Sequence, residues 1–154
     1  MATSIIDGTL EAAELKRVRG KTRVYQSLTF RLRDGSSKSI AKAIAHEDVC
    51  ALLEPGNSGR FYLYTAIDHR GIHGVRDDKG RSVFAYSKVN ETAMLWTAGV
   101  GVAGVLVFLA LEKISLWPIL CIVLGVPLYF LYRQTRAEAT RQYEGDKGPP
   151  QIPA

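Results

Sequence analysis

The residues best suited to metal chemistry occur as two pairs, each with three residues between its members. His46 and Cys50 form the first pair, and His69 and His73 form the second. Zinc binds nitrogen and sulfur ligands tetrahedrally, and two ligands four residues apart on a helix can share one metal. The four residues therefore define a candidate zinc site. The alternative, which we favour, is that the protein needs no cofactor and that Cys50 packs as a small hydrophobic side chain.

A polar stretch, DHRGIHGVRDD, follows a predicted strand and holds a second candidate site. Its acids, histidines and arginines suit a phosphate or carbohydrate ligand, and a histidine that titrates near neutrality suits acid–base work. No nucleophile, phosphate-binding loop or carboxylate pair accompanies the stretch, so we predict no catalytic residue and favour a plain connection between strands. The candidate ligand-binding residues are Asp68, His69, Arg70, His73 and Arg76.

A basic run, LKRVRGKTR, forms the third candidate site. A basic segment close to an anionic leaflet gains about 1 kcal/mol per charged residue, so the run predicts contact with lipid headgroups. Nucleic acid is not favoured, because no recognisable nucleic-acid motif accompanies the run and Glu11 and Glu14 dilute its charge. A solvated strand face is the remaining alternative. The basic residues are Lys16, Arg17, Arg19, Lys21 and Arg23.

The chain that positions these residues divides into three parts of different composition. Residues 1–91 are charged and rich in turns, and we expect them to form a cytoplasmic β-rich domain. Residues 92–132 are almost entirely apolar, which predicts a transmembrane helical hairpin, because about twenty apolar residues cross a bilayer once. Residues 133–154 are polar and predict a cytoplasmic tail that is partly disordered.

The apolar part contains two charged residues, Glu112 and Lys113, near its middle. A charge at the centre of a lipid-exposed helix costs about 2.5–3.5 kcal/mol on insertion scales, so a turn at the far interface is favoured over one long helix. We therefore predict helices over 93–111 and 116–132, joined by a tip at 112–115. A hairpin that enters the bilayer and returns without crossing it is the alternative.

The lysines and arginines around this hairpin predict its orientation. The tip carries Lys113, whereas the segments before and after the hairpin carry several basic residues each, so the positive-inside rule places both termini in the cytoplasm. The first residues lack the basic start and apolar run of a signal peptide, and the two cysteines indicate no disulfide framework. We expect a two-pass protein of a bacterial inner membrane, although a eukaryotic endomembrane protein would share these features.

Small residues are concentrated in the first apolar segment, where TAGVGVAG begins at Thr97. Small residues four apart let two helix backbones approach closely. We expect the two helices of the hairpin to pack against each other there, and the alternative is self-association or docking of another membrane protein. The candidate packing residues are Thr97, Gly99, Gly101, Gly104 and Gly125.

The soluble part is predicted to be α+β, with about five or six short antiparallel strands and one short helix in a compact sheet or partly open barrel. The stretch VYQSLTFRLRDG alternates apolar and polar residues as a half-buried strand does, and Asp34-Gly35 supplies a turn. HEDVCALLE predicts a helix from His46 to Glu54, because acids fill its first turn and Pro55-Gly56 ends it.

These features predict an integral membrane protein that is not an enzyme. Its β domain is expected to be an accessory module that binds a partner protein, lipid or a second copy of itself. The first alternative is a membrane-anchored domain that senses a ligand or a metal through the two histidine-containing sites. The second alternative is a membrane-associated enzyme.

Overall fold

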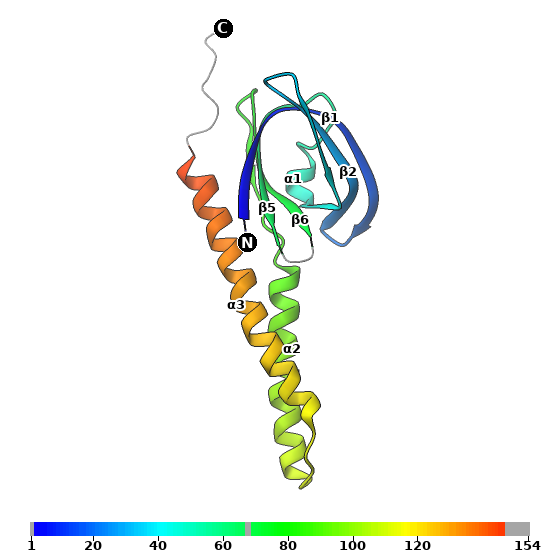
Figure 1. Cartoon of the computed structure of the whole chain (residues 1–154), viewed down its shortest axis with the longest axis vertical. Coiled ribbons are helices and arrows are strands. Elements are labelled where there is room, and N and C mark those ends of the chain that lie inside the picture. The colour runs from blue at the N-terminus through cyan, green and yellow to red at the C-terminus, as the bar shows by residue number, and fades with distance from the viewer. Residues whose placement is uncertain (1, 67–68, 147–154) are drawn as a thin grey trace. The chain divides into compact units, whose positions relative to one another are not determined.

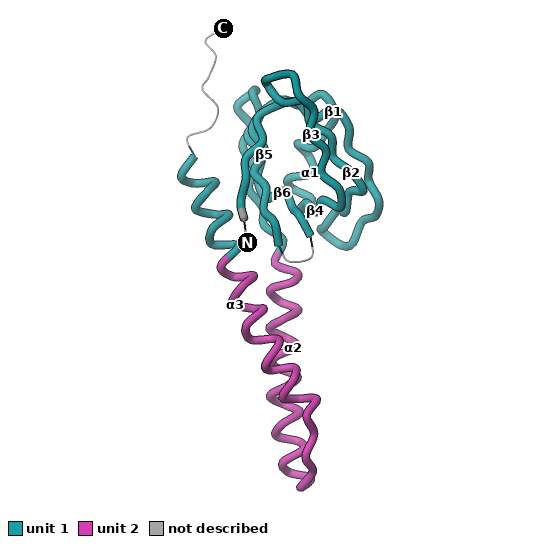
Figure 2. Tube along the Cα trace, in the orientation of Figure 1, with its two compact units in different colours: residues 1–87, 135–154 teal, residues 88–134 magenta. Residues whose placement is uncertain are grey.

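The computed structural model describes residues 2–66 and 69–146, which form seven strands and three helices (Figure 1). The chain divides into two compact units, Met1–Ser87 with Thr135–Ala154 and Lys88–Gln134 (Figure 2). In chain order the elements are β1 (Ala2–Arg19), β2 (Thr22–Leu32), β3 (Ser37–Ala41), β4 (Ala43–His46), α1 (Glu47–Cys50), β5 (Ser58–Thr65), β6 (Arg70–Asp77), β7 (Ser82–Phe84), α2 (Val89–Ala110) and α3 (Leu116–Gly145).

The strands of the first unit form a ring. β1 pairs with β5, β5 with β6, β6 with β4, β4 with β2, and β2 with β1 again, so the ladder closes into a five-stranded barrel. β3 extends the ring beside β2, and β7 pairs with β6. Helix α1 lies between the third and fourth strands of this ring in chain order. Connectivity describes the scaffold and does not assign a ligand.

The sheet is mixed rather than antiparallel throughout, which corrects the prediction. β4 and β6 run parallel, with Ala43 opposite Arg70 and Ile44 opposite Gly71. Parallel neighbours need a crossover connection, which α1 and β5 provide here. The strand count is also higher than predicted, because Lys42, at φ 55°, divides the segment into β3 and β4.

β1 is an 18-residue strand that serves two neighbours in turn. Its first half pairs with β5, and its second half pairs with β2 through a ladder that contains three register shifts. Such bulges increase twist and bend a strand, which lets one strand continue around a barrel. The core inside the ring includes Leu10, Leu28, Phe30 and Phe61, all fully buried, in agreement with the alternation predicted for β2.

The predicted soluble helix is shorter than expected. α1 has four residues, and the amides of Leu52 and Leu53 bond to the carbonyls of Val49 and Cys50 three residues back. These tighter bonds end the helix before Pro55-Gly56 is reached. His46 precedes α1 as its N-cap and accepts a bond from the Asp48 amide at 3.5 Å.

The second unit contains two helices that are long and apolar enough to cross a membrane. Mean hydropathy reaches 2.1 in α2 and 1.7 in α3. Large apolar side chains lie exposed along α2, including Trp96 at 70% and Leu109 at 67%. Monomeric soluble proteins rarely expose large apolar patches.

The tip between these helices is closed by two backbone bonds. The amide of Lys113 donates to the carbonyl of Phe108, and that of Glu112 donates to Leu109, with Glu112 in the left-handed region at φ 53°. This pair of bonds is the Schellman motif, which ends a helix. The two charged residues therefore lie at a turn rather than inside a helix.

The second helix does not end at Tyr132, where the apolar segment ends. α3 continues for another 13 residues to Gly145, through the stretch predicted to be a tail. Its last part belongs to the barrel's unit, where Thr135 and Ala139 are almost completely buried. Residues 147–154 lie outside the described residues.

Candidate interaction sites on the barrel

The structure gives the first predicted metal pair structural roles. The Nδ1 of His46 lies 3.0 Å from a carboxylate oxygen of Asp48, beside the start of α1. Cys50 is buried with its Sγ 3.8 Å from the carbonyl of Ala45, and burial raises the pKa of its thiol. A buried thiol with a raised pKa is a poor thiolate ligand, because metal binding needs the deprotonated form.

The second predicted pair is separated by an aromatic ring. His69 lies edge-on to Tyr64 at 5.7 Å between ring centroids, with its Nε2 3.4 Å from the tyrosine hydroxyl. His73, on β6, is fully buried and packs against the rings of Tyr62, Tyr64 and Phe84. Residues 2–66 and 69–146 contain no group of three or more histidine, cysteine, aspartate or glutamate side chains that could hold a metal ion.

His73 is the most unusual titratable residue of the barrel. Neither ring nitrogen has a hydrogen-bond partner of good geometry. Desolvation by burial lowers the pKa of His73 to about 4, and the nearby backbone of Ala139 opposes that shift. The imidazole is therefore neutral at physiological pH and acts as one member of an aromatic cluster.

The predicted ligand-binding stretch is mostly strand. Arg70–Asp77 forms β6 in the centre of the barrel wall, and Asp68 lies outside the described residues. The four candidate residues that the structure describes do not converge: His69 contacts Tyr64, Arg70 is exposed at the start of β6, His73 lies in the aromatic cluster, and Arg76 contacts the end of α3. Successive side chains of a strand point to opposite faces of the sheet, so the candidate residues on β6 do not share one face.

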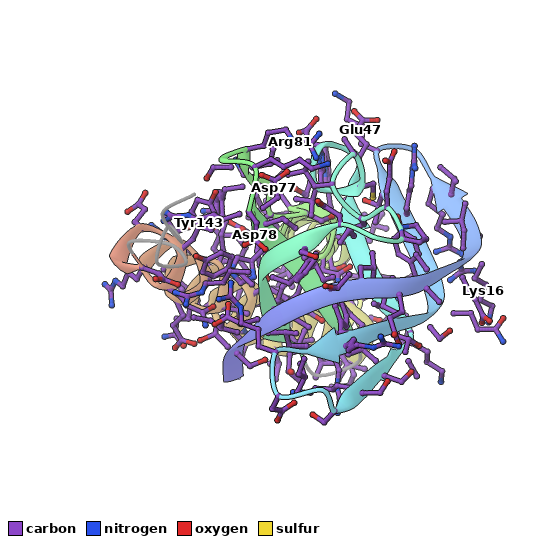
Figure 3. All side chains as sticks on the ribbon, turned by 90° about the horizontal axis from the view of Figure 1, so that it is seen from above. Lys16, Glu47, Asp77, Asp78, Arg81 and Tyr143 are labelled. Atoms are coloured by element: carbon purple, nitrogen blue, oxygen red, sulfur yellow. The ribbon has the colours of Figure 1, made fainter. Side chains whose placement is uncertain are left out.

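Arg76 holds the carboxyl end of α3. Its guanidinium donates to the carbonyls of Asp146 and Tyr143, the latter at 2.9 Å, and its Cζ lies 4.5 Å from the centroid of the Tyr143 ring. The last carbonyls of a helix lack partners within the helix, and a cation there also interacts favourably with the helix dipole. Figure 3 shows Tyr143 on the helix beside the barrel strands.

Arg60 forms the second attachment of this helix. Its Nη1 donates to both carboxylate oxygens of Asp146 at 2.7 Å, and its Nε and Nη2 donate bidentately to Asp7 at 2.7 and 3.0 Å. The bonds to Asp7 and Asp146 raise the pKa of Arg60. The hydroxyl of Tyr62 donates to Asp146 at 2.9 Å, and its pKa is raised by burial and by this bond. Bidentate arginine–carboxylate pairs are the stronger class of ion pair.

Sequence reasoning missed this attachment, although a local signal for it exists. Thr135, Ala139 and Tyr143 are spaced by four, so they lie on one face of a helix, and that face is the one buried against the barrel. Gly74 on β6 makes room for the tyrosine, because a Cβ there would lie 2.6 Å from its ring.

The predicted basic site lies on the β1–β2 hairpin, around the two-residue turn at Gly20-Lys21. Lys21 pairs with Glu47 at 3.5 Å, whereas Lys16, Arg17 and Arg19 have no ion-pair partner among the residues that the structure describes. Lys16 lies at the margin of the barrel in Figure 3. Arg23 is exposed beside Tyr25.

Two apolar side chains are exposed within this basic hairpin. Leu15 is 51% exposed and Val18 is 58% exposed. The sequence alone did not reveal them, because strand alternation would place every second side chain of the hairpin inside the barrel. The register shifts in β1 between Glu14 and Arg17 disturb that alternation.

The predicted packing residues of the hairpin differ in what they contact. A Cβ at Gly101 would lie 2.7 Å from the carbonyl oxygen of Pro118, and one at Gly125 would lie 2.9 Å from the amide nitrogen of Ala98. Gly104 likewise faces Pro118, at 3.0 Å. Gly99 meets nothing within 4 Å, and the hydroxyl of Thr97 bonds back to its own helix at Ala93.

A cleft of about 290 Å³ opens at one end of the barrel. The free edge of β3 and the first half of β1 border it, together with the end of β5 and the start of β6. Ile6, Ile40 and Leu63 form its apolar floor, and Lys38 and Arg70 stand at its rim. We call this cleft the barrel mouth.

No protein-family model, no curated protein and no solved structure matches this chain.

Proposed function

We propose that this chain is an integral membrane protein in which α2 and α3 anchor the barrel and the β1–β2 hairpin binds anionic lipid. The observation that carries the proposal is the exposure of Leu15 and Val18 among five basic residues. Apolar side chains insert at the boundary between headgroups and acyl chains, while neighbouring cations are attracted to anionic headgroups.

The charge of the hairpin supports the same proposal. Lys16, Arg17 and Arg19 have no carboxylate partner within the described part of the chain, in contrast to Arg31, which pairs with Glu11 on the same two strands. Each free cation near an anionic leaflet contributes about 1 kcal/mol, so three of them together with two apolar anchors support a stable contact.

The distribution of basic residues supports a cytoplasmic barrel. Lys113 is the one basic residue of the tip, whereas Arg133, Arg136 and Arg141 follow the apolar segment. The positive-inside rule puts the basic side of a hairpin in the cytoplasm, and the cytoplasmic leaflet is the one that carries anionic lipid.

The test uses the full chain in nanodiscs with an environment-sensitive fluorophore attached at Val18→Cys. We expect a blue shift and protection from a soluble quencher when the nanodisc contains phosphatidylserine, or when phosphatidylserine vesicles are added to neutral nanodiscs. High salt should reverse both changes, because it screens exposed charges. The unsubstituted chain gives the labelling background of Cys50 and Cys121.

Two variants with the same change in charge provide the control. Arg17→Gln in the labelled chain should weaken vesicle binding about fivefold, the equivalent of one interfacial cation. Lys79→Gln, in the exposed turn between β6 and β7, should leave it unchanged. The lipid proposal would be wrong if the emission spectrum did not change with phosphatidylserine in the nanodisc or in added vesicles. A shift with an acidic polypeptide alone would instead indicate that the hairpin binds a protein partner.

A further inference from the structure

We propose that the barrel mouth is a binding site for a small organic anion, held by Lys38 and Arg70 with its apolar body on the floor of the cleft. This site is separate from the β1–β2 hairpin and does not depend on the function proposed for it. Mouths of β-barrels are a preferred location for ligand sites, which are mostly apolar clefts with a few placed polar groups.

The charge of the mouth is the first argument. Lys38 on β3 and Arg70 on β6 both line the cleft, and neither has an ion-pair partner among the described residues. Four other arginines of the barrel have carboxylate partners, in contrast to Arg70: Arg31 with Glu11, Arg33 with Asp78, Arg60 with Asp7 and Asp146, and Arg81 with Asp77. Within residues 2–66 and 69–146 no carboxylate lines the mouth, so none of these residues neutralises its two cations.

The second argument is the chemistry of the walls. Ser4 and Thr65 add hydroxyl groups at the rim, and the almost fully buried Tyr64 completes the lining. Hydroxyls donate hydrogen bonds to anionic oxygens, and an arginine fork matches a carboxylate or phosphate oxygen pair. The floor below is formed by aliphatic side chains.

These features select a class of ligand. A bare inorganic anion would satisfy the cations but leave the apolar floor wet, whereas a neutral apolar molecule would leave both cations without a partner. A ligand with one phosphate or carboxylate group and a compact apolar body fits both surfaces. A cleft of about 290 Å³ is at the lower end of the size range of ligand pockets, which limits the ligand to a small molecule or the headgroup region of a lipid.

The experiment measures binding of phenyl phosphate, benzoate and inorganic phosphate to the full chain in neutral phosphatidylcholine nanodiscs, by isothermal titration calorimetry. We expect saturable binding of phenyl phosphate at least about tenfold tighter than that of inorganic phosphate, because the phenyl ring buries apolar surface on the floor. Lys38→Ala and Arg70→Ala should each weaken it about tenfold, and Arg70→Lys should weaken it less. Lys79→Ala, an exposed cation outside the mouth, is the matched control.

Competition distinguishes a free ligand from a lipid headgroup. If phosphatidic acid in the nanodisc competes with phenyl phosphate and Arg70→Ala abolishes that competition, the anion is a lipid headgroup. If anionic lipid has no effect, the anion is a soluble metabolite. Absence of saturable binding of any probe to the unsubstituted chain would overturn the proposal, as would unchanged affinity in a folded Lys38→Ala, Arg70→Ala double variant.

Discussion

The most constrained single residue of the barrel is His73. Its imidazole is fully buried among three aromatic rings and under the last turns of α3. Burial in this setting disfavours the charged form and lowers its pKa to about 4. The unfolded chain restores the ordinary pKa, so folding and proton binding are linked at this position.

The linkage predicts that the barrel loses stability in acid. Between about pH 6.5 and 4 the unfolded state binds a proton at His73 that the folded state does not, so the free energy of unfolding falls as the pH falls. Over this range the free energy of unfolding falls by about 3 kcal/mol, since each unit of pKa shift is worth about 1.4 kcal/mol. Thermal melts of the full chain across this range measure it.

His73→Leu is the variant that isolates this effect. It replaces the imidazole by an apolar side chain and should flatten the dependence of the melting temperature on pH between about 6.5 and 4. If the melting temperature depended on pH equally steeply in the unsubstituted chain and in His73→Leu, groups other than His73 would cause the acid sensitivity.

At the scale of single elements, the last turns of α3 are bound to the barrel by charge and by aromatic packing. Asp146 lies 86 residues from Arg60 in the chain and is 16% exposed in the pair that they form. Tyr143 packs edge-on to Tyr62, at 4.8 Å between ring centroids, and against Phe84. The two kinds of contact act on one short segment, so that segment should loosen as a unit.

We predict that Asp146→Asn releases this segment. The neutral amide cannot balance the charge of Arg60, so the free energy of unfolding should fall by about 2 kcal/mol. That is the scale of a hydrogen bond to a charged group in a mostly buried setting. Hydrogen exchange of the amides of 135–145 should increase, and the melting temperature should fall. Asp78→Asn is the matched control, because its pair with Arg33 is exposed and long, at 3.5 Å, and such pairs contribute little. Equal effects of both variants would contradict the assignment.

The helices of the hairpin give a second prediction at this scale. Gly101→Leu places a large side chain against the backbone of Pro118 and should separate α2 from α3, lowering thermal stability in detergent. Gly99→Leu is the control, because open space surrounds that position. If Gly99→Leu is the more damaging variant in native membranes, a partner helix packs on that face.

At the scale of the whole molecule, one chain combines a charged barrel with an apolar hairpin. The formal net charge is +5, yet residues 92–132 contain only two charged side chains, Glu112 and Lys113. Because the chain returns from the hairpin into α3 residues that bind the barrel, the hairpin is connected to the barrel at both of its ends.

This arrangement predicts a membrane topology that can be measured. With a membrane-impermeant thiol reagent, Lys79→Cys should be labelled from the cytoplasmic side and Ser115→Cys from the opposite side. The unsubstituted chain should stay unlabelled, since Cys50 is buried and Cys121 lies within α3. Labelling of both new cysteines from the cytoplasmic side would establish a hairpin that does not cross.

The sequence by itself determined the features that depend on neighbours in the chain. Alternation in VYQSLTFRL predicted the buried side of β2, where Leu28 and Phe30 are fully buried, and the run of apolar residues predicted two long helices with a turn at Glu112 and Lys113. Turns, strand faces and apolar segments are encoded over a few residues, because backbone preference and periodicity are local properties.

The tertiary structure alone decided which distant segments meet. The parallel pairing of β4 with β6, the docking of Tyr143 and Asp146 on the barrel, and the meeting of Lys38 with Arg70 at its mouth all join residues far apart in the chain. Such contacts depend on strand register, and a shift of one residue would send every side chain of a strand to the other face. Spacing along the chain can mark a buried helix face, as it does at Thr135, Ala139 and Tyr143, but it does not say which strand that face contacts.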